Sequence, residues 1–457
     1  MLLGRRFSSF VEESPVSVMV RGTLERIFDP DKLESVFDEN AVLQYTKELT
    51  FSQCIDIMSD VVLRTSPSVG AFYKDHEDEI PVSRQAVYDK LKRMELPISA
   101  ALVRYSADEL LPALRKMKAT PKSLLPGYRV RVLDGNHLAG TEHRILELRR
   151  YRAAALPGQA LVFYDPRFDL CTDVFPCEDA YAQERSLLDR VLENVVAYDC
   201  IVADRNFCTT GFLFGIVRRG AFFVVRQHAS TLHWELIGRR RRVGKDAKGR
   251  WIYEQSVRLT DPQTDETFVA RRITIPLKNP TSKGETEIHV LTNLPAEAAD
   301  AVKIADLYAD RWTIESAFQH LTEDLRCEID TLGYPKAALL GFCVALLAYN
   351  VVSMVKGAIR AVWGKRFVEE ELSMYYLTLE VSRISSGMMI AIGQKPWEIF
   401  RKISIEEYVD TMIELAGHID TRKYTKHKRG PKKKPPKKIS GKRNHHVSTA
   451  RILAKKK

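Results

Sequence analysis

No C-x-x-C pair occurs among the seven cysteines of this chain, and no histidine is spaced to complete a metal site with them. Neither a disulfide framework nor a structural zinc site therefore organises the fold. The first fifteen residues also lack the apolar stretch of a secretory signal. We accordingly expect a reducing compartment, the cytoplasm and nucleoid of a bacterial-type cell.

Acidic residues are missing from one long segment. Residues 421–457 hold 16 Lys and Arg and no Asp or Glu, which leaves 54 of the 70 basic residues against 59 acidic residues elsewhere. The body of the chain is thus slightly acidic, and the positive charge is concentrated in a Pro-containing tail that is too polar to pack. Such a tail favours nucleic acid as a partner, although a solubilising charge run has the same composition.

Long apolar runs are scarce as well. The one stretch with the hydropathy of a membrane span covers residues 337–355, AALLGFCVALLAYNVVSMV. A buried helix in a large core needs the same apolar character, and polar side chains gather at one end of this stretch. Because the composition of the 457 residues, 45% hydrophobic and 28% charged, is that of a globular protein, we predict a core helix and no membrane partner.

The pattern along the chain predicts an α/β protein of two or three domains. Residues 1–120 read as helices, and the segment PVSRQAVYDKLKRM combines a Ser83 cap with an apolar stripe and a basic face. That helix could read DNA or lie on the surface as an ordinary amphipathic helix. We therefore describe residues 1–120 as a helical DNA-binding or accessory domain.

Strands dominate the middle of the chain. The short apolar segments YRVRVLDGNH, QALVFYDP, LCTDVFP and CIVAD surround a helical spacing over residues 181–196. Residues 221–295 alternate in the manner of strands separated by turn residues and predict a β-rich insertion. Helices follow over about 297–326 and 336–363, so residues 121–220 and 296–365 form the predicted core. Residues 366–420 form a helical C-terminal region, and residues 421–457 form a basic disordered tail.

Two aspartates end apolar strands. Asp134 shares a face with Val130 and Val132 by the period of two, and Asp204 closes the run CIVAD. A carboxylate at the end of an apolar strand must be solvated, paired or bound to a cation. Either residue alone could be a helix cap or a turn residue, but two such acids on neighbouring strands would hold a divalent ion.

A third acid lies on a predicted helix. In the segment LYADRWTIESAFQHLTEDL, Arg311, Glu315 and Thr322 fall on one polar face at 3.6 residues per turn. Leucine, isoleucine and phenylalanine side chains form the adjoining apolar stripe, which can dock on a sheet. Glu315 is therefore expected at the rim of the core.

These residues resemble the insertion-sequence transposases of the DDE superfamily. Their signature runs Tyr, two residues, Arg, three residues, Glu, six residues, Lys, and Tyr308, Arg311 and Glu315 match it, whereas Thr322 replaces the Lys. The segments LDGNHLAGTEHR around Asp134 and VADRNFCT around Asp204 resemble the two aspartate segments of that family. The three segments occur in the order of the family, with 70 residues from Asp134 to Asp204 and 111 from Asp204 to Glu315.

The resemblance implies a ribonuclease H-like catalytic core with a mixed sheet, in which Asp134, Asp204 and Glu315 are the catalytic and metal-binding residues. It implies two Mg²⁺ ions, or Mn²⁺ in their place, which activate a water or a DNA 3′-OH and stabilise the leaving oxygen. The implied partners are double-stranded DNA, as element ends and as target, and a second copy of the chain in the DNA complex.

Other residues are candidates for DNA contact. Arg311 could bind phosphate or brace its helix, and Tyr308 could stack near the cleaved end or brace as well. Trp234, or Trp251 in its place, could stack an unpaired base, although a Trp in a sheet is usually core. The basic candidates are Arg239, Arg240, Arg241 and Arg242 in the insertion and Lys432, Lys433 and Lys434 in the tail.

Asn136, His137 and Asn206 flank the aspartates and could orient them or only satisfy turn backbones. Two rival functions stand beside the transposase: a nuclease of the same fold that stops at cleavage, and a DNA-binding protein derived from a transposase that has lost catalysis. Thr322 is the one residue that favours the second rival.

Overall fold

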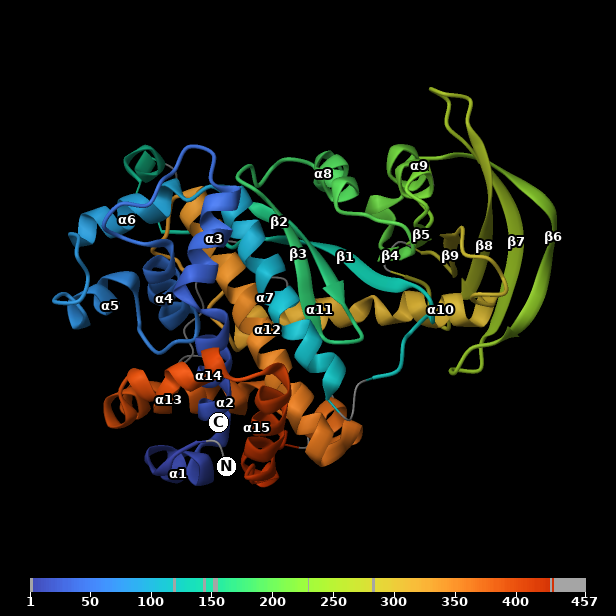
Figure 1. Cartoon of the computed structure of the whole chain (residues 1–457). Helices are drawn as coiled ribbons and strands as arrows, with labels where there is room; N and C mark the ends of the chain where they lie inside the picture. Colours follow the sequence, from blue (N-terminus) through green and yellow to red (C-terminus); the bar gives the residue numbers. More distant parts are fainter. Residues whose placement is uncertain are drawn as a thin grey trace, which may run out of the picture.

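The computed structural model describes residues 3–117, 121–142, 145–150, 155–228, 230–281, 284–427 and residue 430. Within these residues nine strands form one sheet in the order β3-β2-β1-β4-β5-β9-β8-β7-β6 (Figure 1). The strands are β1 (Arg129–His137), β2 (Gln159–Asp165), β3 (Leu170–Cys177), β4 (Asp199–Ala203), β5 (Phe222–Arg226), β6 (His233–Lys245), β7 (Trp251–Thr260), β8 (Thr267–Pro276) and β9 (Glu287–Thr292).

The sheet is mixed, as the sequence predicts. β1 runs parallel to β4 and β4 parallel to β5, whereas the neighbouring strands on both sides pair antiparallel. β4 is buried along its whole length, which agrees with the apolar run CIVAD. The strands within 221–295 continue this same sheet, because β9 pairs directly with β5 and β6–β8 extend it further.

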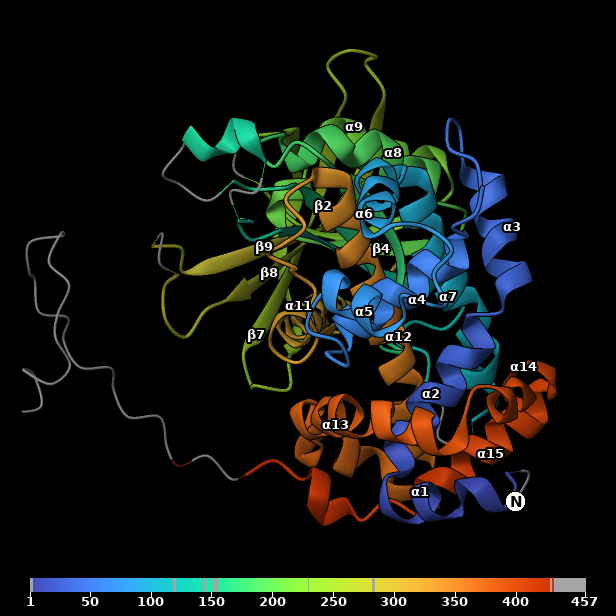
Figure 2. The ribbon, with the colours of Figure 1, turned by 90° about the vertical axis from the view of Figure 1, so that its left-hand side faces the viewer.

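Helices cover both faces of the sheet. α8 and α9 pack on one face and share a buried cluster with Leu133, Ile201 and Phe223, while the N-terminal and C-terminal helices pack on the other face (Figures 1 and 2). The helices are α1 (Ser8–Glu13), α2 (Pro15–Ile27), α3 (Pro30–Asn40), α4 (Phe51–Val62), α5 (Val69–Asp75), α6 (Arg84–Arg93), α7 (Leu96–Lys116), α8 (Leu188–Glu193), α9 (Thr210–Arg218), α10 (Ala301–Asp310), α11 (Trp312–Glu323), α12 (Pro335–Arg366), α13 (Met374–Ile392), α14 (Ile399–Lys402) and α15 (Ile405–Gly417).

The apolar segment 337–355 lies inside α12, the central helix of the second cluster. α12 packs against α7, α4, α2, α15 and β3, so helices from both ends of the chain meet on it. It is the one helix of the described chain that is long and apolar enough to cross a membrane, and its most apolar window is 100% buried within the fold. The apolar side chains are thus used for packing.

Several element boundaries differ from the predicted ones. The helical spacing over 181–196 becomes a short 3-10 turn, η3 (Glu184–Leu187), followed by α8. The predicted helix over 297–326 is interrupted at Arg311, where backbone hydrogen bonds join Arg311 to Tyr308 and Ile314 to Arg311, each three residues apart. The tightened turn accompanies the reach of the Arg311 side chain toward the sheet.

The C-terminal tail begins later than residue 421. Tyr424 is buried, its carbonyl accepts from the backbone of Ser373 at 2.8 Å, and Thr425 forms a β-bridge with Leu372. The expectation that disorder starts at 421 is therefore wrong for residues 421–427, because an aromatic anchor ties them to the start of α13. Lys432, Lys433 and Lys434 lie outside the described residues.

Candidate active site at the ends of two parallel strands

Asp134 and Asp204 lie at the same level on adjacent parallel strands. Leu133 of β1 pairs with Ala203 of β4, and the residue that follows each of them is an aspartate. Neighbouring strands are about 4.8 Å apart, which brings the two carboxylates within reach of a common ligand. Asp204 also begins the 3-10 turn η4 (Arg205–Phe207), where its Oδ1 accepts from the backbone N–H of Asn206.

Glu315 reaches the same place from α11. The guanidinium of Arg311 lies between two of the acids, with Nη1 2.8 Å from Oδ2 of Asp134 and Nη2 2.8 Å from Oε1 of Glu315. The charges of Asp204 and Glu315 both act on the Asp134 carboxyl. The three acids that the sequence singled out therefore converge on one site, although 181 residues separate the first from the last.

The electrostatics of the site depend on burial and on Arg311. The pKa of Asp134 is raised to about 6, mainly by burial; Arg311 and the backbone N–H of Gly135 lower it, whereas the charges of Asp204 and Glu315 raise it. Burial alone would lower the pKa of Arg311, but the carboxylates of Asp134 and Glu315 raise it above its ordinary value. Arg311 is the counter-charge of a half-buried acidic cluster.

The donor atoms of this arrangement suit a divalent cation, but their positions in this structure do not form a metal site. Carboxylate oxygens at strand ends are the ligands that Mg²⁺ and Mn²⁺ prefer. In the part of the chain that the structure describes, however, no group of three or more His, Cys, Asp or Glu side chains is placed to hold a metal ion. Arg311 occupies the space between two of the acids, so a metal would take its place.

Tyr308 and Arg311 are both buried, at 6% exposure each. Burial raises the pKa of the Tyr308 phenol, which also forms a side-chain hydrogen bond with Arg311. In this structure the Tyr308 ring packs in the core beside Arg311, and its stacking on DNA stays a prediction. The phosphate contact expected of Arg311 is likewise replaced here by its two carboxylates.

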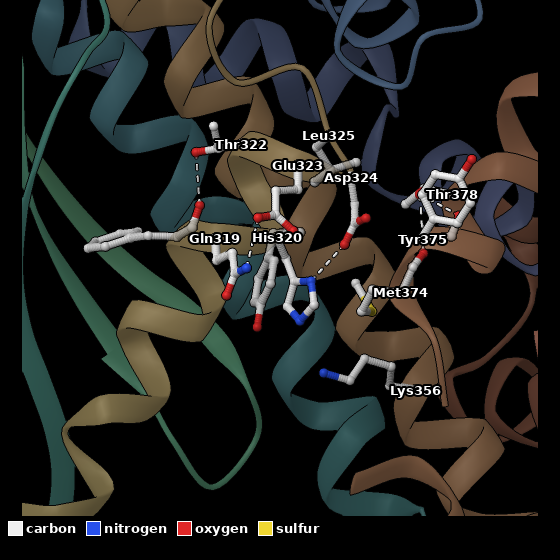
Figure 3. A network of polar contacts seen from close by, with 12 residues as sticks. Gln319, His320, Thr322, Glu323, Asp324, Leu325, Lys356, Met374, Tyr375 and Thr378 are labelled. Carbon is white, nitrogen blue, oxygen red and sulfur yellow. Dashed lines mark hydrogen bonds and ion pairs between the residues drawn. The ribbon is translucent and has the colours of Figure 1, made fainter. Parts of the chain in front are cut away.

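Thr322 stands on the exposed side of α11, two turns after Glu315. Its hydroxyl donates to the carbonyl of Phe318 at 3.1 Å, in the usual way of a helical threonine. Figure 3 shows Thr322 on the side of α11 away from Lys356, whereas His320 and Asp324 point toward α12 and α13 and form a pair at 2.6 Å. No other side chain of α11 fills the role of the missing Lys on the Thr322 side.

The arginine run lies on β6, the edge strand. Almost every residue of β6 is exposed, so the strand shows no alternation of apolar and polar residues in the sequence. Arg240 pairs with Glu287 at 2.7 Å and covers the ring of Tyr253, while Arg242 covers Trp251 at 4.1 Å. Trp234 is covered by Arg272 at 5.4 Å. Two arginines of the basic run thus lie over aromatic rings of the neighbouring strand.

The register of the sheet places the two tryptophans at opposite ends of the β6–β7 hairpin. One line of paired residues crosses the sheet through Arg226, Val290, Ile273, Glu254 and Arg241. Arg226 ends β5, and β6 runs in the same direction as β5. Trp251, which pairs with Lys245, therefore lies toward the edge that carries Asp204, and Trp234 lies toward the other edge.

Sequence reasoning missed several residues around the acids. Arg205 and Arg226 share Glu285, at 3.4 and 2.6 Å, beside Asp204. Glu184 accepts a hydrogen bond from Asn206, which had been considered only as an orienting residue. Asn136 and His137 make no side-chain hydrogen bond within the described residues. The missed residues come from distant segments, and nothing in their local pattern marks them.

Fold and site together define a mixed α/β protein with three acids gathered around the ends of two parallel strands. Residues 126–351 match the family described as "Transposase DDE domain". A curated relative, "Putative transposase y4zB" of Sinorhizobium fredii (strain NBRC 101917 / NGR234), is 27% identical over 195 residues, which cover 42% of this chain and 51% of that protein. The chain therefore matches about half of the relative's length. These two matches support a DDE-family transposase.

Among solved structures, the chain resembles the cryo-EM structure of the piggyBac transposase synaptic complex with hairpin DNA. The two share 11% sequence identity and a TM-score of 0.37, over 85% of this chain and 83% of that chain.

Proposed function

We propose that this protein is a DNA transposase that binds the terminal inverted repeats of an insertion sequence and cuts and joins phosphodiester bonds with Asp134, Asp204 and Glu315. The observation that carries the proposal is the convergence of these three acids, with Arg311 bridging Asp134 and Glu315 at 2.8 Å each. The match of residues 126–351 to a transposase DDE domain supports it independently.

The core is proposed to be ribonuclease H-like, with β6–β9 as an insertion that extends its sheet. The strand order β3-β2-β1-β4-β5, with β1, β4 and β5 parallel, supports this assignment. α10 and α11 then cross beneath the acids and bring in Glu315. The helices α1–α7 and α13–α15 flank this core as accessory elements.

In the proposed mechanism Asp134, Asp204 and Glu315 hold two Mg²⁺ or Mn²⁺ ions, which when bound supply an activated water or 3′-OH and stabilise the leaving oxygen. Arg311 keeps the carboxylates together before the substrate arrives. A DNA phosphate offers its planar guanidinium an alternative bidentate partner, so Arg311 can exchange the acids for the scissile strand. This exchange reconciles the buried ion pairs with the expected phosphate contact.

The proposed partners are double-stranded DNA, at element ends and at the target, and a second copy of the chain in the complex with DNA. Arg239, Arg241, Arg242 and the Lys432 to Lys434 run of the tail are proposed to bind the backbone without reading sequence. Such a protein would act on the bacterial nucleoid. The exposed arginines of β6 support this part of the proposal.

Asp134→Asn tests the proposal against both rivals. The variant should bind duplex DNA with the affinity of the wild type and lose cleavage by about a thousandfold or more in Mn²⁺, which corresponds to about 4 kcal/mol. Cleavage of supercoiled plasmid is the assay, and Asp265→Asn on an exposed turn is the control. Wild-type protein that binds DNA but never cuts it would instead identify the inactive DNA-binding protein.

A second assay separates transposase from nuclease. Duplexes that end in the inverted repeats flanking the coding sequence, already cut to expose a 3′-OH, should be joined to plasmid by the wild type and not by Asp134→Asn. Cutting without any joining would favour the nuclease of the same fold.

A further inference from the structure

Asn206 connects the second aspartate to a segment outside the acidic cluster. Its backbone N–H donates to Oδ1 of Asp204, and its side-chain Nδ2 donates to Oε2 of Glu184. Its carbonyl accepts from Nε of Arg185 at 2.7 Å. Glu184 and Arg185 open η3, the turn between β3 and α8. Two of these three contacts, those with Glu184 and Arg185, therefore fix the Asp204 loop to η3.

The same carboxylate contacts the segment of the first aspartate. Glu184 packs directly on Gly135, where a Cβ would overlap Oε1 of Glu184 and lie 2.8 Å from its Cδ and 3.3 Å from Cδ2 of Leu161. The backbone of Gly135 is not among those with positive φ. Glycine is needed at 135 for the close approach of Glu184, and any larger residue would push the carboxylate away.

Glu184 lies on the face of the sheet opposite to the Asp134 carboxylate. Successive residues of a strand point to opposite faces, so Gly135 faces η3 and α8 whereas Asp134 faces α10 and α11. The charges that most affect the pKa of the Asp134 carboxyl are those of Arg311, Asp204 and Glu315. Glu184 thus contacts the glycine that follows Asp134 and the side chain of Asn206, two residues after Asp204.

We propose that Glu184 is a positioning residue that sets the spacing of the Asp134 and Asp204 carboxylates by holding Gly135 and Asn206 on one side chain. The proposal rests on the proposed function, because the spacing matters for the metal that these acids are proposed to hold. Loss of a group that orients metal ligands typically weakens metal affinity about 10- to 100-fold.

Substitutions at 184 separate positioning from ligation. In Glu184→Gln the amide oxygen can accept the same hydrogen bond from Asn206, and the side chain keeps its volume against Gly135. A positioning role survives that change, whereas a role as a fourth metal ligand requires the carboxylate. Glu184→Ala removes both the bond and the packing. Glu193→Ala, at the exposed end of α8, is the matched control.

Mn²⁺ binding to the full chain, followed by electron paramagnetic resonance, provides a readout other than activity. Glu184→Ala should bind Mn²⁺ at least about tenfold more weakly than the wild type, with Glu184→Gln within about threefold of it. Glu193→Ala should be unchanged. Thermal unfolding without metal establishes that each variant is folded. Wild-type affinity in Glu184→Ala, or equal losses in Glu184→Ala and Glu184→Gln, would overturn the proposal.

Gly135→Ala gives an independent test should Glu184→Ala fold poorly. It should weaken Mn²⁺ binding to the same degree, and the double variant Gly135→Ala/Glu184→Ala should bind no more weakly than Gly135→Ala alone, because the clash is then absent. Additive losses would contradict the shared role. Plasmid cleavage by the wild type distinguishes the two hypotheses: if it persists while Glu184 has no effect, only the positioning role fails, and if wild type neither cleaves nor binds Mn²⁺, both fail.

Discussion

Nη1 of Arg311 lies 2.8 Å from Oδ2 of Asp134, although 177 residues separate the two in sequence. The other terminal nitrogen of the same guanidinium contacts Glu315 one turn further along. Arg311 therefore occupies the position where a divalent ion would bring these two carboxylates together. Under the proposed function, a bound metal and the guanidinium would compete for the same oxygens.

Arg311→Ala should bind Mn²⁺ more tightly than the wild type in the absence of DNA. Removal of the competing cation leaves Asp134 and Glu315 without a counter-charge, and we expect a gain of about tenfold in affinity, equivalent to about 1.4 kcal/mol. The metal-free variant should be less stable by about 3 kcal/mol, because a half-buried ion pair has lost one partner. Thermal unfolding at increasing Mn²⁺ measures both effects.

The control for Arg311→Ala is Arg258→Ala, which removes an exposed arginine paired with Glu235 on the β6–β7 hairpin. That variant should leave Mn²⁺ affinity unchanged. A weaker Mn²⁺ affinity in Arg311→Ala would show that the guanidinium supports the metal site and does not compete with it.

Thr322→Lys should strengthen binding to duplex DNA. The residue is exposed on α11 on the face of Glu315, so a Lys there can reach a phosphate with a stability change below about 0.5 kcal/mol. The slope of log affinity against log salt should steepen by about one phosphate contact. Ser316→Lys adds the same charge on another face of α11. Equal effects of the two variants would mean that net charge alone matters.

Trp251→Ala should weaken binding to DNA with an unpaired overhang more than Trp234→Ala does. The two rings are similarly exposed, at 39% and 36%, but the register places Trp251 toward the edge that carries Asp204. Loss of one stacked base is worth about 1 to 3 kcal/mol. Fluorescence anisotropy of overhang and blunt duplexes compares the variants, and a larger effect of Trp234→Ala would contradict the edge assignment.

His289 should make the extended sheet sensitive to acid. Burial first, and then the neighbouring Arg272, lower the pKa of His289 to about 4, below its ordinary value of 6.5. The unfolded chain therefore takes up a proton below pH 6.5 that the folded chain does not accept. Stability from this residue is complete above pH 6.5 and is lost as the pH falls toward 4.

In His289→Gln the free energy of unfolding should fall less between pH 7 and pH 4 than in the wild type, by at most about 3 kcal/mol. Urea unfolding at several pH values measures the difference, and His233→Gln at the exposed start of β6 serves as the comparison. Parallel pH curves for wild type and His289→Gln would remove His289 as the cause.

The sequence singles out the three acids because their signals are local. Asp134 and Asp204 follow apolar strands, and Glu315 lies beside an apolar stripe on a helix, so burial and periodicity mark all three. The two aspartates meet because β1 and β4 are parallel neighbours, and α11 brings Glu315 to them. The mixed α/β class follows from the same patterns, and the structure confirms it.

Long-range partners left no such signal. Glu184 lies in a stretch with helical spacing, and nothing near it indicates that it meets Gly135 and Asn206 from two other segments. The many charges of β6 hide it as a strand in the sequence. It forms a strand because its backbone pairs with β7. Tyr424 likewise has no local signal, because its burial beside the start of α13 depends on a distant segment.

The buried course of α12 limits how this molecule can be dissected. Helices that precede the sheet and helices that follow it pack on this same helix, so removal of either end would expose its apolar side chains. Substitutions and insertions would be tolerated mainly in solvent-facing residues and loops. Exchange of all the N-terminal or all the C-terminal helices would expose α12 itself.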